Sequence, residues 1–271
     1  MMENRKIIVS CTTTDKRLQL LYYTLISLSN QRLKPDMIFV NLSKEPYLGD
    51  DGIDTLPPWF DEFGVSINWV ENTGSFRKLL PIFEKNLAND QDLVITIDDD
   101  VLYGENWLED LVDQNDKHWD AIVCTRGRKI KKNIFGRWEN YAKWNLVTKE
   151  TEGLDILPTG VGGIVYKKSL IDVEFLLDNK FKEVASTTDD LWFKMASYRK
   201  HTPVVVCPQI NSQNIYLQHQ LGLEQINFNK KTNYIYKVYN KAFGWIVDWF
   251  GVNRTKNDIC WDAICKYSSD R

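Results

Sequence analysis

Short apolar runs alternate with amphipathic segments along most of the chain, and this alternation predicts an α/β protein. The first run, residues 6–11, is expected to be a buried strand because Ile and Val fit a pleated surface. Residues 16–31 follow with leucines at helical spacing, and the next apolar run completes a βαβ unit, which favours a parallel neighbour. Further strands are expected at residues 35–43, 65–71, 93–97, 121–124 and 202–207. Helices are expected at residues 76–90 and 105–116, and another is expected to start within residues 187–200.

The second half of the chain is less regular. Residues 126–138 contain six Lys or Arg and no acidic residue, which predicts a basic loop. A stretch with three glycines, residues 157–171, leads into another strand. We therefore expect a mostly parallel sheet in a catalytic domain of residues 1–226, divided into halves of about 1–104 and about 105–226. Residues 227–271 are expected to form a helical, aromatic-rich and basic extension.

Composition narrows the class of protein. The 271 residues are 43% hydrophobic with a net charge of −3, which fits a globular protein and argues against a nucleic-acid partner. Five cysteines without a C-x-x-C pair fit a reducing compartment. The N-terminus has no apolar signal region, and no apolar run approaches the ~20 residues of a membrane span. We expect a cytoplasmic protein.

Three adjacent carboxylates, Asp98, Asp99 and Asp100, follow the strand expected at residues 93–97. Ligands of parallel sheets bind at the carboxyl ends of strands, and a cation would offset the mutual repulsion of these groups. In an extended segment, side chains at positions i and i+2 share a face, so Asp98 and Asp100 would serve one ligand assembly and Asp99 would point elsewhere. A site of this kind suits Mg²⁺ or Mn²⁺ completed by phosphate oxygens. The alternative is a solvated acidic turn.

A second acidic pair, Asp189 and Asp190, follows Thr187 and Thr188, either of which is a suitable N-cap. A helix N-terminus stabilises a carboxylate, so the pair could supply a general base that stays ionised. The alternative is that these residues only cap the helix.

Two further features fit an anionic ligand. Arg77 and Lys78 are expected near a helix start, where the helix dipole disfavours cations unless an anion is nearby. Gly160, Gly162 and Gly163 mark a sharp turn or a close approach of the backbone to a ligand. An ordinary solvated charge pair and a tight turn are the alternatives.

Several familiar sites are excluded by their missing motifs. The chain has no P-loop, no complete G-x-G-x-x-G and no G-x-S-x-G. The acidic stretch lacks EF-hand spacing, and three histidines are too few for a His-cluster metal site.

The order and spacing of four motifs resemble a known family. "DDDV-Y" followed by "W-L", then "GVGG", then "DD-W" is similar to the GT-A glycosyltransferases, and closest to the family-2-like bacterial sugar transferases. The resemblance runs from about residue 6 to residue 207. It implies the GT-A fold, in which a mostly parallel sheet is flanked by helices.

The resemblance also implies roles for individual residues. Asp100 would bind the metal, and Asp98 would bind the metal and the ribose or donor sugar. Asp190 matches the catalytic base, although Asp189 stays open because the usual pair is Glu-Asp. His219 matches a late metal-binding histidine. The donor and nucleotide side would further comprise Thr12, Thr13, Arg17, Lys78, Asp99, Gly162 and Gly163.

The activity implied by the resemblance is Mn²⁺- or Mg²⁺-dependent sugar transfer from a nucleotide sugar, with a UDP-sugar as the first candidate, to an acceptor hydroxyl. Inversion fits a positioned base, and retention stays open. The acceptor would be a glycan or a lipid-linked molecule in bacterial surface polysaccharide or glycolipid synthesis. One alternative is a nucleotidyltransferase, but the loop after the first strand, "SCTTTDKR", has no glycine. The other is an inactive module that binds sugar nucleotides or glycans, against which the intact carboxylates argue.

The extension suggests a membrane contact. Residues 230–254 mix large aromatic residues with lysines and one acidic residue, a composition that suits the surface of an anionic membrane. Residues 126–137 would add a second contact, at the inner face of the membrane. Packing of the extension on the catalytic domain, or a dimer contact, is the alternative.

Overall fold

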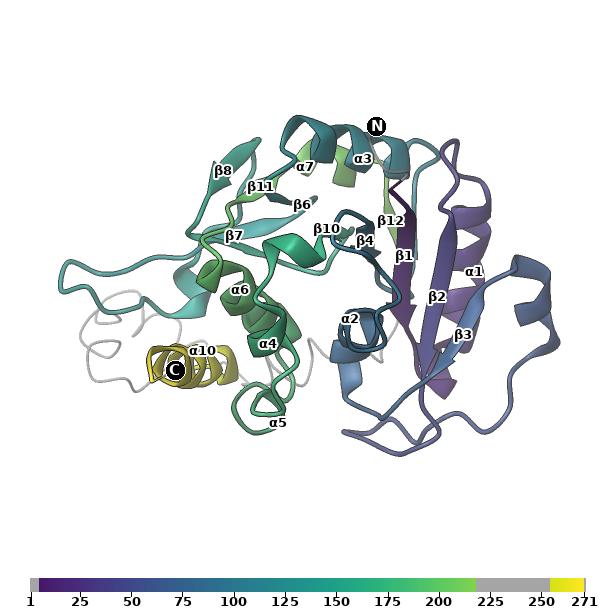
Figure 1. Cartoon of the computed structure of the whole chain (residues 1–271), viewed down its shortest axis with the longest axis horizontal. Coiled ribbons are helices and arrows are strands. Elements are labelled where there is room, and N and C mark those ends of the chain that lie inside the picture. The colour runs from purple at the N-terminus through teal and green to yellow at the C-terminus, as the bar shows by residue number, and fades with distance from the viewer. Residues whose placement is uncertain (1–4, 218–253, 271) are drawn as a thin grey trace, which may run out of the picture.

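The computed structural model describes residues 5–217 and 254–270. One eight-stranded sheet crosses this part of the molecule in the order β3-β2-β1-β4-β10-β6-β11-β8 (Figure 1). Only β10 and β8 run antiparallel to the other strands of this sheet. The α/β fold with a mostly parallel sheet is therefore confirmed. The strands are β1 (Ile7–Thr12), β2 (Met37–Leu42), β3 (Ser66–Trp69), β4 (Leu93–Thr96), β6 (Ile122–Cys124), β8 (Thr151–Gly153), β10 (Ile164–Tyr166) and β11 (Val204–Val206).

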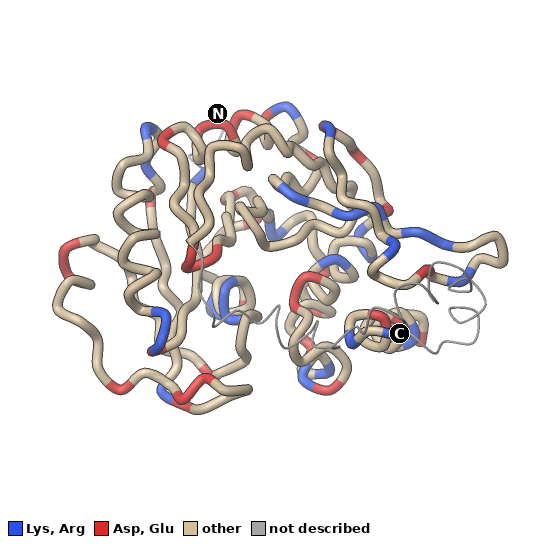
Figure 2. The backbone as a smooth tube through the Cα atoms, turned by 180° about the vertical axis from the view of Figure 1, so that it is seen from behind, with Lys and Arg blue, Asp and Glu red and all other residues tan. Residues whose placement is uncertain are grey.

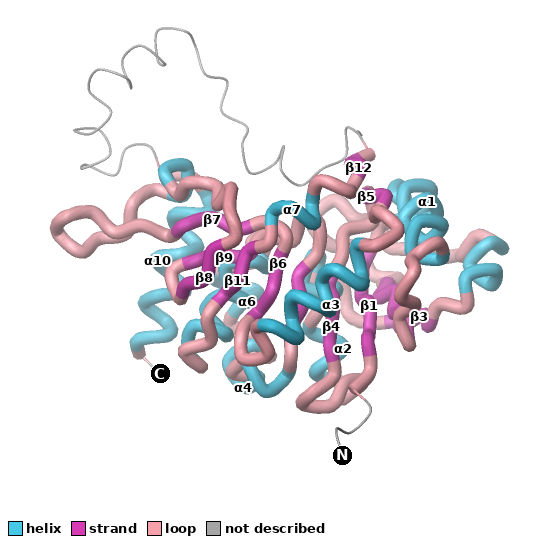
Figure 3. Tube along the Cα trace, turned by 90° about the horizontal axis from the view of Figure 1, so that it is seen from above, coloured by secondary structure: helices cyan, strands magenta, loops and turns pink. Residues whose placement is uncertain are grey.

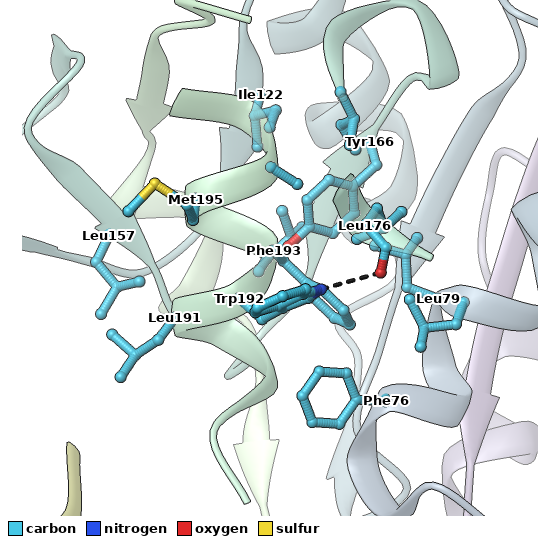
Figure 4. Packing of buried hydrophobic residues seen from close by; sticks show 14 of the residues in the cluster. Phe76, Leu79, Ile122, Leu157, Tyr166, Leu176, Leu191, Trp192, Phe193 and Met195 are labelled. Carbon is cyan, nitrogen blue, oxygen red and sulfur yellow. Dashed lines mark hydrogen bonds between the residues drawn. The ribbon is translucent and has the colours of Figure 1, made fainter. Parts of the chain in front are cut away.

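Helices cover both faces of the sheet (Figures 1 and 3). Alternate residues of each strand enter different cores, so Ile8 packs with α2, α4 and α6, whereas Val9 packs with α1 and α3. Figure 4 shows the first core, where Trp192 lies buried and its indole N–H donates to the Leu176 carbonyl at 2.9 Å. The helices are α1 (Leu18–Ser29), α2 (Leu80–Glu84), α3 (Trp107–Lys117), α4 (Val173–Leu176), α5 (Phe181–Val184), α6 (Asp189–Arg199), α7 (Pro208–Asn211) and α10 (Lys256–Ser269).

The helix expected at residues 76–90 is shorter and differently built. A 3-10 helix spans Gly74–Lys78, and α2 begins only at Leu80. Pro81 lies in the first turn of α2, where its missing N–H is tolerated, but its ring excludes a continuous helix through the preceding turn. Asn86 has a φ of +50°, which ends the helical path.

The segment predicted as a basic loop, residues 126–138, is a loop only in part. Its first residues form β7 (Gly127–Lys129), which pairs with β9 (Ile156–Pro158) in a separate two-stranded sheet. A Cβ on Gly127 would lie 2.8 Å from Val206, so glycine permits this close packing. A second small sheet joins β5 (Val101–Leu102) to β12 (Ile215–Tyr216).

The described part of the C-terminal extension is helical, as predicted. Helix α10 packs on α6, and Trp261 makes edge-on contacts with Trp138 and Trp144 at 5.6 Å each. The aromatic stretch at residues 230–253 and His219 lie outside the described residues. No helix in the described ranges is long and apolar enough to cross a membrane.

Candidate active site

Lys78 lies at the centre of a carboxylate cluster drawn from both predicted halves of the catalytic domain. Its Nζ is 2.7 Å from Asp189 Oδ2, 3.8 Å from Asp190 Oδ1 and 4.0 Å from Asp98 Oδ1. Burial alone would lower the pKa of Lys78, but the three carboxylates outweigh it and hold that pKa well above its ordinary value. Lys78 is therefore a fixed positive charge that joins the triplet after β4 to the pair at the start of α6.

The acidic triplet does not follow the alternation of a strand, because β4 ends at Thr96 and the chain turns at Asp99 and Asp100. Asp99 is buried, and its Oδ2 accepts from Thr13 Oγ1 at 2.5 Å and from Arg17 Nε at 3.0 Å. Arg17 Nη2 contacts Asp99 Oδ1 and also lies 2.9 Å from Asp100 Oδ2. Arg17 therefore serves two members of the triplet, and the expectation that Asp98 and Asp100 share a face by strand geometry is wrong.

Asp98 approaches Lys78, with 4.0 Å between Oδ1 and Nζ. Its backbone N–H donates to the Tyr103 hydroxyl at 3.2 Å, and its side chain stays 30% exposed. Burial raises the pKa of Asp98 to about 6, Lys78 opposes this shift, and the neighbouring Asp100 adds to it. Asp98 is thus the most exposed member of the triplet, and the cation nearest to it, Lys78, is 4.0 Å away.

The acidic pair begins α6, as predicted. Helix capping alone does not explain the contacts that the pair makes. Thr188 is the N-cap residue and makes no capping hydrogen bond with its side chain. Asp189 is buried and accepts from Ser75 Oγ at 2.8 Å. Asp190 accepts at Oδ2 from the Gly160 N–H at 3.2 Å, and its side chain is 28% exposed.

The electrostatic environment of Asp190 differs from the one expected. Burial, followed by the nearby Asp189, raises the pKa of Asp190 to about 7, while Lys78 and the Gly160 N–H only partly oppose the shift. The expectation that the helix N-terminus keeps this group fully ionised is therefore wrong, because burial and the neighbouring Asp189 raise its pKa. A carboxyl group that titrates near neutral pH is well matched to proton transfer.

The three glycines after β9 divide into two kinds. A Cβ on Gly160 would lie 2.6 Å from Lys78 Nζ and 3.5 Å from Asp190 Oδ1, so this glycine makes room for the cluster. Gly162 and Gly163 have φ values of +86° and +114°, and a Cβ on Gly163 would lie 2.7 Å from the Trp107 ring. These two residues form a tight turn against the protein, and their part in donor binding stays a prediction.

The remaining donor-side residues surround the end of β1. The Thr12 hydroxyl donates to the Asn41 carbonyl at 2.8 Å. Arg77 is 2% exposed and pairs with Asp50 at 2.9 Å, so its anionic partner lies within the protein. The roles of Thr12, Thr13, Arg17 and Asp99 toward a nucleotide stay predictions, since their described bonds are to the protein itself.

Two residues of the cluster were not predicted as site residues. Ser75 lies one 3-10 turn before Lys78, and both reach Asp189 because their side chains leave the same side of this tight helix. Gly160 was expected only as a turn or a point of close approach. The motif "TGSFRK" carries the signal for Ser75, since small polar and basic residues three apart align in a 3-10 helix.

The cluster has an excess of negative charge. Five carboxylates, from Asp98 to Asp100 and from Asp189 and Asp190, face the two cations Arg17 and Lys78. Carboxylate oxygens are hard ligands that fit Mg²⁺ or Mn²⁺, and such ions take only one or two carboxylates with the remaining ligands from phosphates and water. Within the described residues no three candidate ligands gather into a metal site, and His219 lies outside them. Asp98 and Asp100, whose side chains are 30% and 23% exposed, are the carboxylates that a cation could reach together with a ligand's oxygens.

One family model matches part of the chain. The profile of glycosyl transferase family 2 matches residues 86–178, a segment that includes the acidic triplet and the three glycines and ends before Asp189. No curated protein matches the chain.

Three solved structures are similar to the chain. One is 4-diphosphocytidyl-2C-methyl-D-erythritol synthase, at 12% identity and a TM-score of 0.47, with 83% of this chain and 98% of that one covered. Residues 1–349 of S. aureus TarS give 18% identity and a TM-score of 0.45, with 74% of this chain and 57% of that one covered. A longer S. aureus TarS structure gives 17% identity and a TM-score of 0.46, with 74% of this chain and 35% of that one covered. The family match confirms the resemblance of this chain to the family-2 sugar transferases through the segment that contains Asp98, Asp99 and Asp100.

Proposed function

We propose that this protein is a metal-dependent glycosyltransferase that moves a sugar from a nucleotide-diphosphate sugar to an acceptor hydroxyl with inversion. The observation that carries the proposal is the meeting of two acidic motifs at Lys78. Asp98 and Asp190 are 92 positions apart in the sequence, yet both approach the same ammonium group within 4.0 Å. Sugar transfer of this kind requires one carboxylate for the metal and another for the acceptor proton, close together. Asp98 and Asp190 would take these two roles.

Asp190 is the better candidate for the base. Asp189 is buried and held by Ser75 and Lys78, so both of its oxygens are engaged. Asp190 is more exposed, and the Gly160 N–H fixes one of its oxygens. As the acceptor oxygen attacks the sugar, Asp190 would take the hydroxyl proton, a contribution of about 10²- to 10⁴-fold to the rate. Asp189 and Ser75 would then position Lys78, which in turn fixes the electrostatic environment of Asp190.

Asp98 and Asp100 would hold the metal. Their environment fits a cation, since the pKa of Asp98 is already raised by burial and by Asp100. When bound, Mn²⁺ or Mg²⁺ would neutralise charge on the leaving nucleoside diphosphate. His219 is proposed as a further ligand. Thr12, Thr13 and Arg17 lie at the end of β1, where a nucleotide would bind at the carboxyl edge of the sheet.

The finer assignments follow the family resemblance and stay part of the proposal. The donor would be a UDP-sugar, and the acceptor a glycan or a lipid-linked molecule used for bacterial surface polysaccharide or glycolipid. The enzyme would work in the cytoplasm at the inner face of the membrane.

The test is release of nucleoside diphosphate from a panel of nucleotide sugars, with and without Mn²⁺. Turnover that needs Mn²⁺ and disappears in Asp190→Asn, but survives in the exposed control Asp61→Asn, supports the proposal. Donor binding without turnover would indicate a binding module, and release of pyrophosphate from a nucleoside triphosphate and a sugar phosphate would indicate a nucleotidyltransferase. A bound donor at a hundredfold excess over Kd should stabilise the protein by about 2.7 kcal/mol, which thermal unfolding can detect.

A further inference from the structure

A pocket with a volume of about 360 Å³ lies between the hairpin that follows β7 (residues 130–139), the turn before β9, and helices α6 and α10. This volume falls within the range of about 300–1,000 Å³ that is typical of small-molecule sites. Most of the described residues that line it are apolar or aromatic: Ile130, Trp138, Leu154, Met195, Tyr198 and Trp261. The carboxylates around Lys78 are not among these lining residues, so the pocket is separate from the candidate active site.

The aromatic walls of the pocket are fixed by contacts within the protein. The Trp138 ring lies edge-on to Trp261 of α10 at 5.6 Å, and α10 packs on α6. Trp144 is buried beside Trp261, and its indole N–H donates to the Glu139 carbonyl at 2.9 Å. The fold itself therefore holds these rings in place, as it does in most small-molecule sites.

Two buried nitrogen donors beside this pocket have no hydrogen-bond partner among the described residues. One is the indole nitrogen of Trp261, a residue that is only 3% exposed. The other is the ammonium group of Lys194, which is fully buried and lies 5.7 Å from the centre of the Tyr198 ring. Burial lowers the pKa of Lys194 to about 8, and Asp155 opposes this shift only in part. Buried donors are nearly always paired, so two of them beside one pocket indicate a ligand that supplies acceptor oxygens.

The pocket also has charged residues of both signs, with positive charge in excess nearby. Lys132 is a lining residue, and its Nζ lies 4.1 Å from the centre of the Trp138 ring. Asp155 is a lining residue as well, and its Oδ1 pairs with Lys129 Nζ at 2.6 Å. Residues 126–138 contain six Lys or Arg and no acidic residue, and Figure 2 shows basic residues along this segment. A ligand would therefore meet several hydrogen-bond donors and the Asp155 carboxylate, which accepts.

We propose that this pocket binds one sugar unit of a saccharide. The C–H face of a sugar ring is apolar and would pack on the Trp138 and Tyr198 rings. Hydroxyl oxygens of the sugar would accept hydrogen bonds from the Trp261 N–H and Lys132, and a hydroxyl group would donate to Asp155. A hydrocarbon chain fits less well, because it would leave the buried donors unpaired. A free phosphate also fits less well, because most of the lining is apolar.

Helix α6 connects this pocket to the proposed base. Tyr198 follows Asp190 by eight positions in the helix, which corresponds to about 12 Å along its axis. Strand β9 also leads from the pocket to the acidic cluster, since Asp155 precedes it and Gly160 follows it. A glycan acceptor of several units would therefore place an inner unit in the pocket and present its end unit to Asp190. This acceptor role rests on the proposed function, whereas saccharide binding itself does not.

The experiment is isothermal titration calorimetry of the full chain, without donor or metal, against maltotetraose, cellotetraose, chitotetraose and tetragalacturonic acid. We expect at least one of these saccharides to bind. Tyr198→Ala should weaken its binding about tenfold, because it removes a surface on which the sugar ring packs. Trp261→Phe keeps a ring but removes the N–H, so it should weaken binding about fivefold, the effect of one hydrogen bond. Matched controls are Tyr23→Ala and Trp119→Phe, at residues of α1 and of the segment after α3 that are 46% and 70% exposed.

The proposal is overturned if none of the four saccharides binds at millimolar concentration. It is also overturned if Tyr198→Ala and Trp261→Phe, folded by near-ultraviolet circular dichroism, bind the saccharide as tightly as the two controls. Loss of self-association in Tyr198→Ala with unchanged saccharide binding, measured by sedimentation velocity, would assign the pocket to a second copy of the chain and overturn it too. Because no donor is present, a failure of sugar transfer does not affect these results. Weaker binding in the variants with an unchanged KM for a glycan acceptor would support the pocket and overturn only its acceptor role.

Discussion

The triplet after β4 and the pair at the start of α6 share one arrangement of side chains. In each, one carboxylate is buried and bonded, and a neighbour stays accessible. Asp99 and Asp189 are the buried members, whereas Asp98 and Asp190 keep 30% and 28% of their side chains exposed. The pKa values of the accessible members are raised to about 6 and about 7, and burial raises the pKa of Asp99 as well. Both motifs therefore expose one carboxylate that is held short of full ionisation at neutral pH.

The two motifs differ in where their neutralising charge comes from. Asp99 is paired with Arg17, and both belong to residues 1–104. Asp189 is paired with Lys78 and bonded to Ser75, both of which precede it by more than a hundred residues. The cation that pairs with the triplet thus comes from the same half of the chain as the triplet. The cation that pairs with Asp189 comes from the other half. Changes in the triplet should act on metal and donor, and changes in the pair should act on proton transfer.

The largest effect is expected from Asp100→Asn. It removes an anionic ligand of a hard cation, so metal-dependent turnover should fall below detection and the Mn²⁺ dependence of nucleotide binding should weaken. The measurement is nucleoside diphosphate release across a Mn²⁺ titration. Asp61→Asn, an exposed acid distant in sequence, serves as the control. Wild-type activity in Asp100→Asn would remove the metal assignment.

Asp190→Asn should lower kcat by about 10²- to 10⁴-fold and leave donor affinity intact, because a base acts in the chemical step. Asp189→Asn should cost less, since its carboxylate acts through Lys78. A base with a pKa of about 7 also predicts that wild-type kcat/KM rises about tenfold per pH unit below pH 7 and levels off above it. If Asp189→Asn is the more damaging variant, the order of the two residues has been misassigned.

The sequence predicts the first half of the fold better than the second. β1, β2 and β4 appear where apolar runs lie, because parallel strands buried on both faces need continuous apolar sequence. After residue 124 the strands are two or three residues long, too short for a clear period, and β7 begins at a glycine that packs under Val206. Short strands of this kind are set by tertiary contacts, which residue patterns do not carry.

For the candidate site, the sequence motifs pointed to the carboxylates that come together but not to the contacts between them. Asp98, Asp100 and Asp190 were found from their motifs, whereas the central place of Lys78 between them depends on how the halves close. Arg17 was expected to face a nucleotide, yet its described bonds go to Asp99 and Asp100. The raised pKa of Asp190 could not be predicted either, because burial depends on the surrounding fold.

Asp99→Asn and Asp98→Asn are expected to differ in their effect on the free energy of unfolding. Asp99→Asn removes the buried carboxylate that pairs with the Arg17 guanidinium, leaves Asp100 as the remaining partner of Arg17, and alters the bond from Thr13, so the free energy of unfolding should fall by about 2–3 kcal/mol. Asp98→Asn should cost much less or nothing, since it removes a partly exposed charge from an acidic cluster. Urea unfolding of the two variants checks this difference. Equal stability of both would show that burial of Asp99 does not depend on its pairing.

The smallest effect concerns the pH dependence of stability. The folded state raises the pKa of Asp190 to about 7, above the value of about 4 for an unfolded aspartate, mainly by burial and then by Asp189. Between these values the unfolded chain loses its proton first, so ionisation favours unfolding and stability falls as pH rises from about 4 to about 7. Asn cannot ionise, so Asp190→Asn should be more stable than the wild type by about 1 kcal/mol or more at pH 8, and the difference should vanish near pH 4. Thermal unfolding of metal-free protein at both pH values measures it, with Asp61→Asn as the control for losing one negative charge. A variant that is less stable than the wild type at pH 8 would show that Lys78 gains more from the Asp190 carboxylate than burial costs.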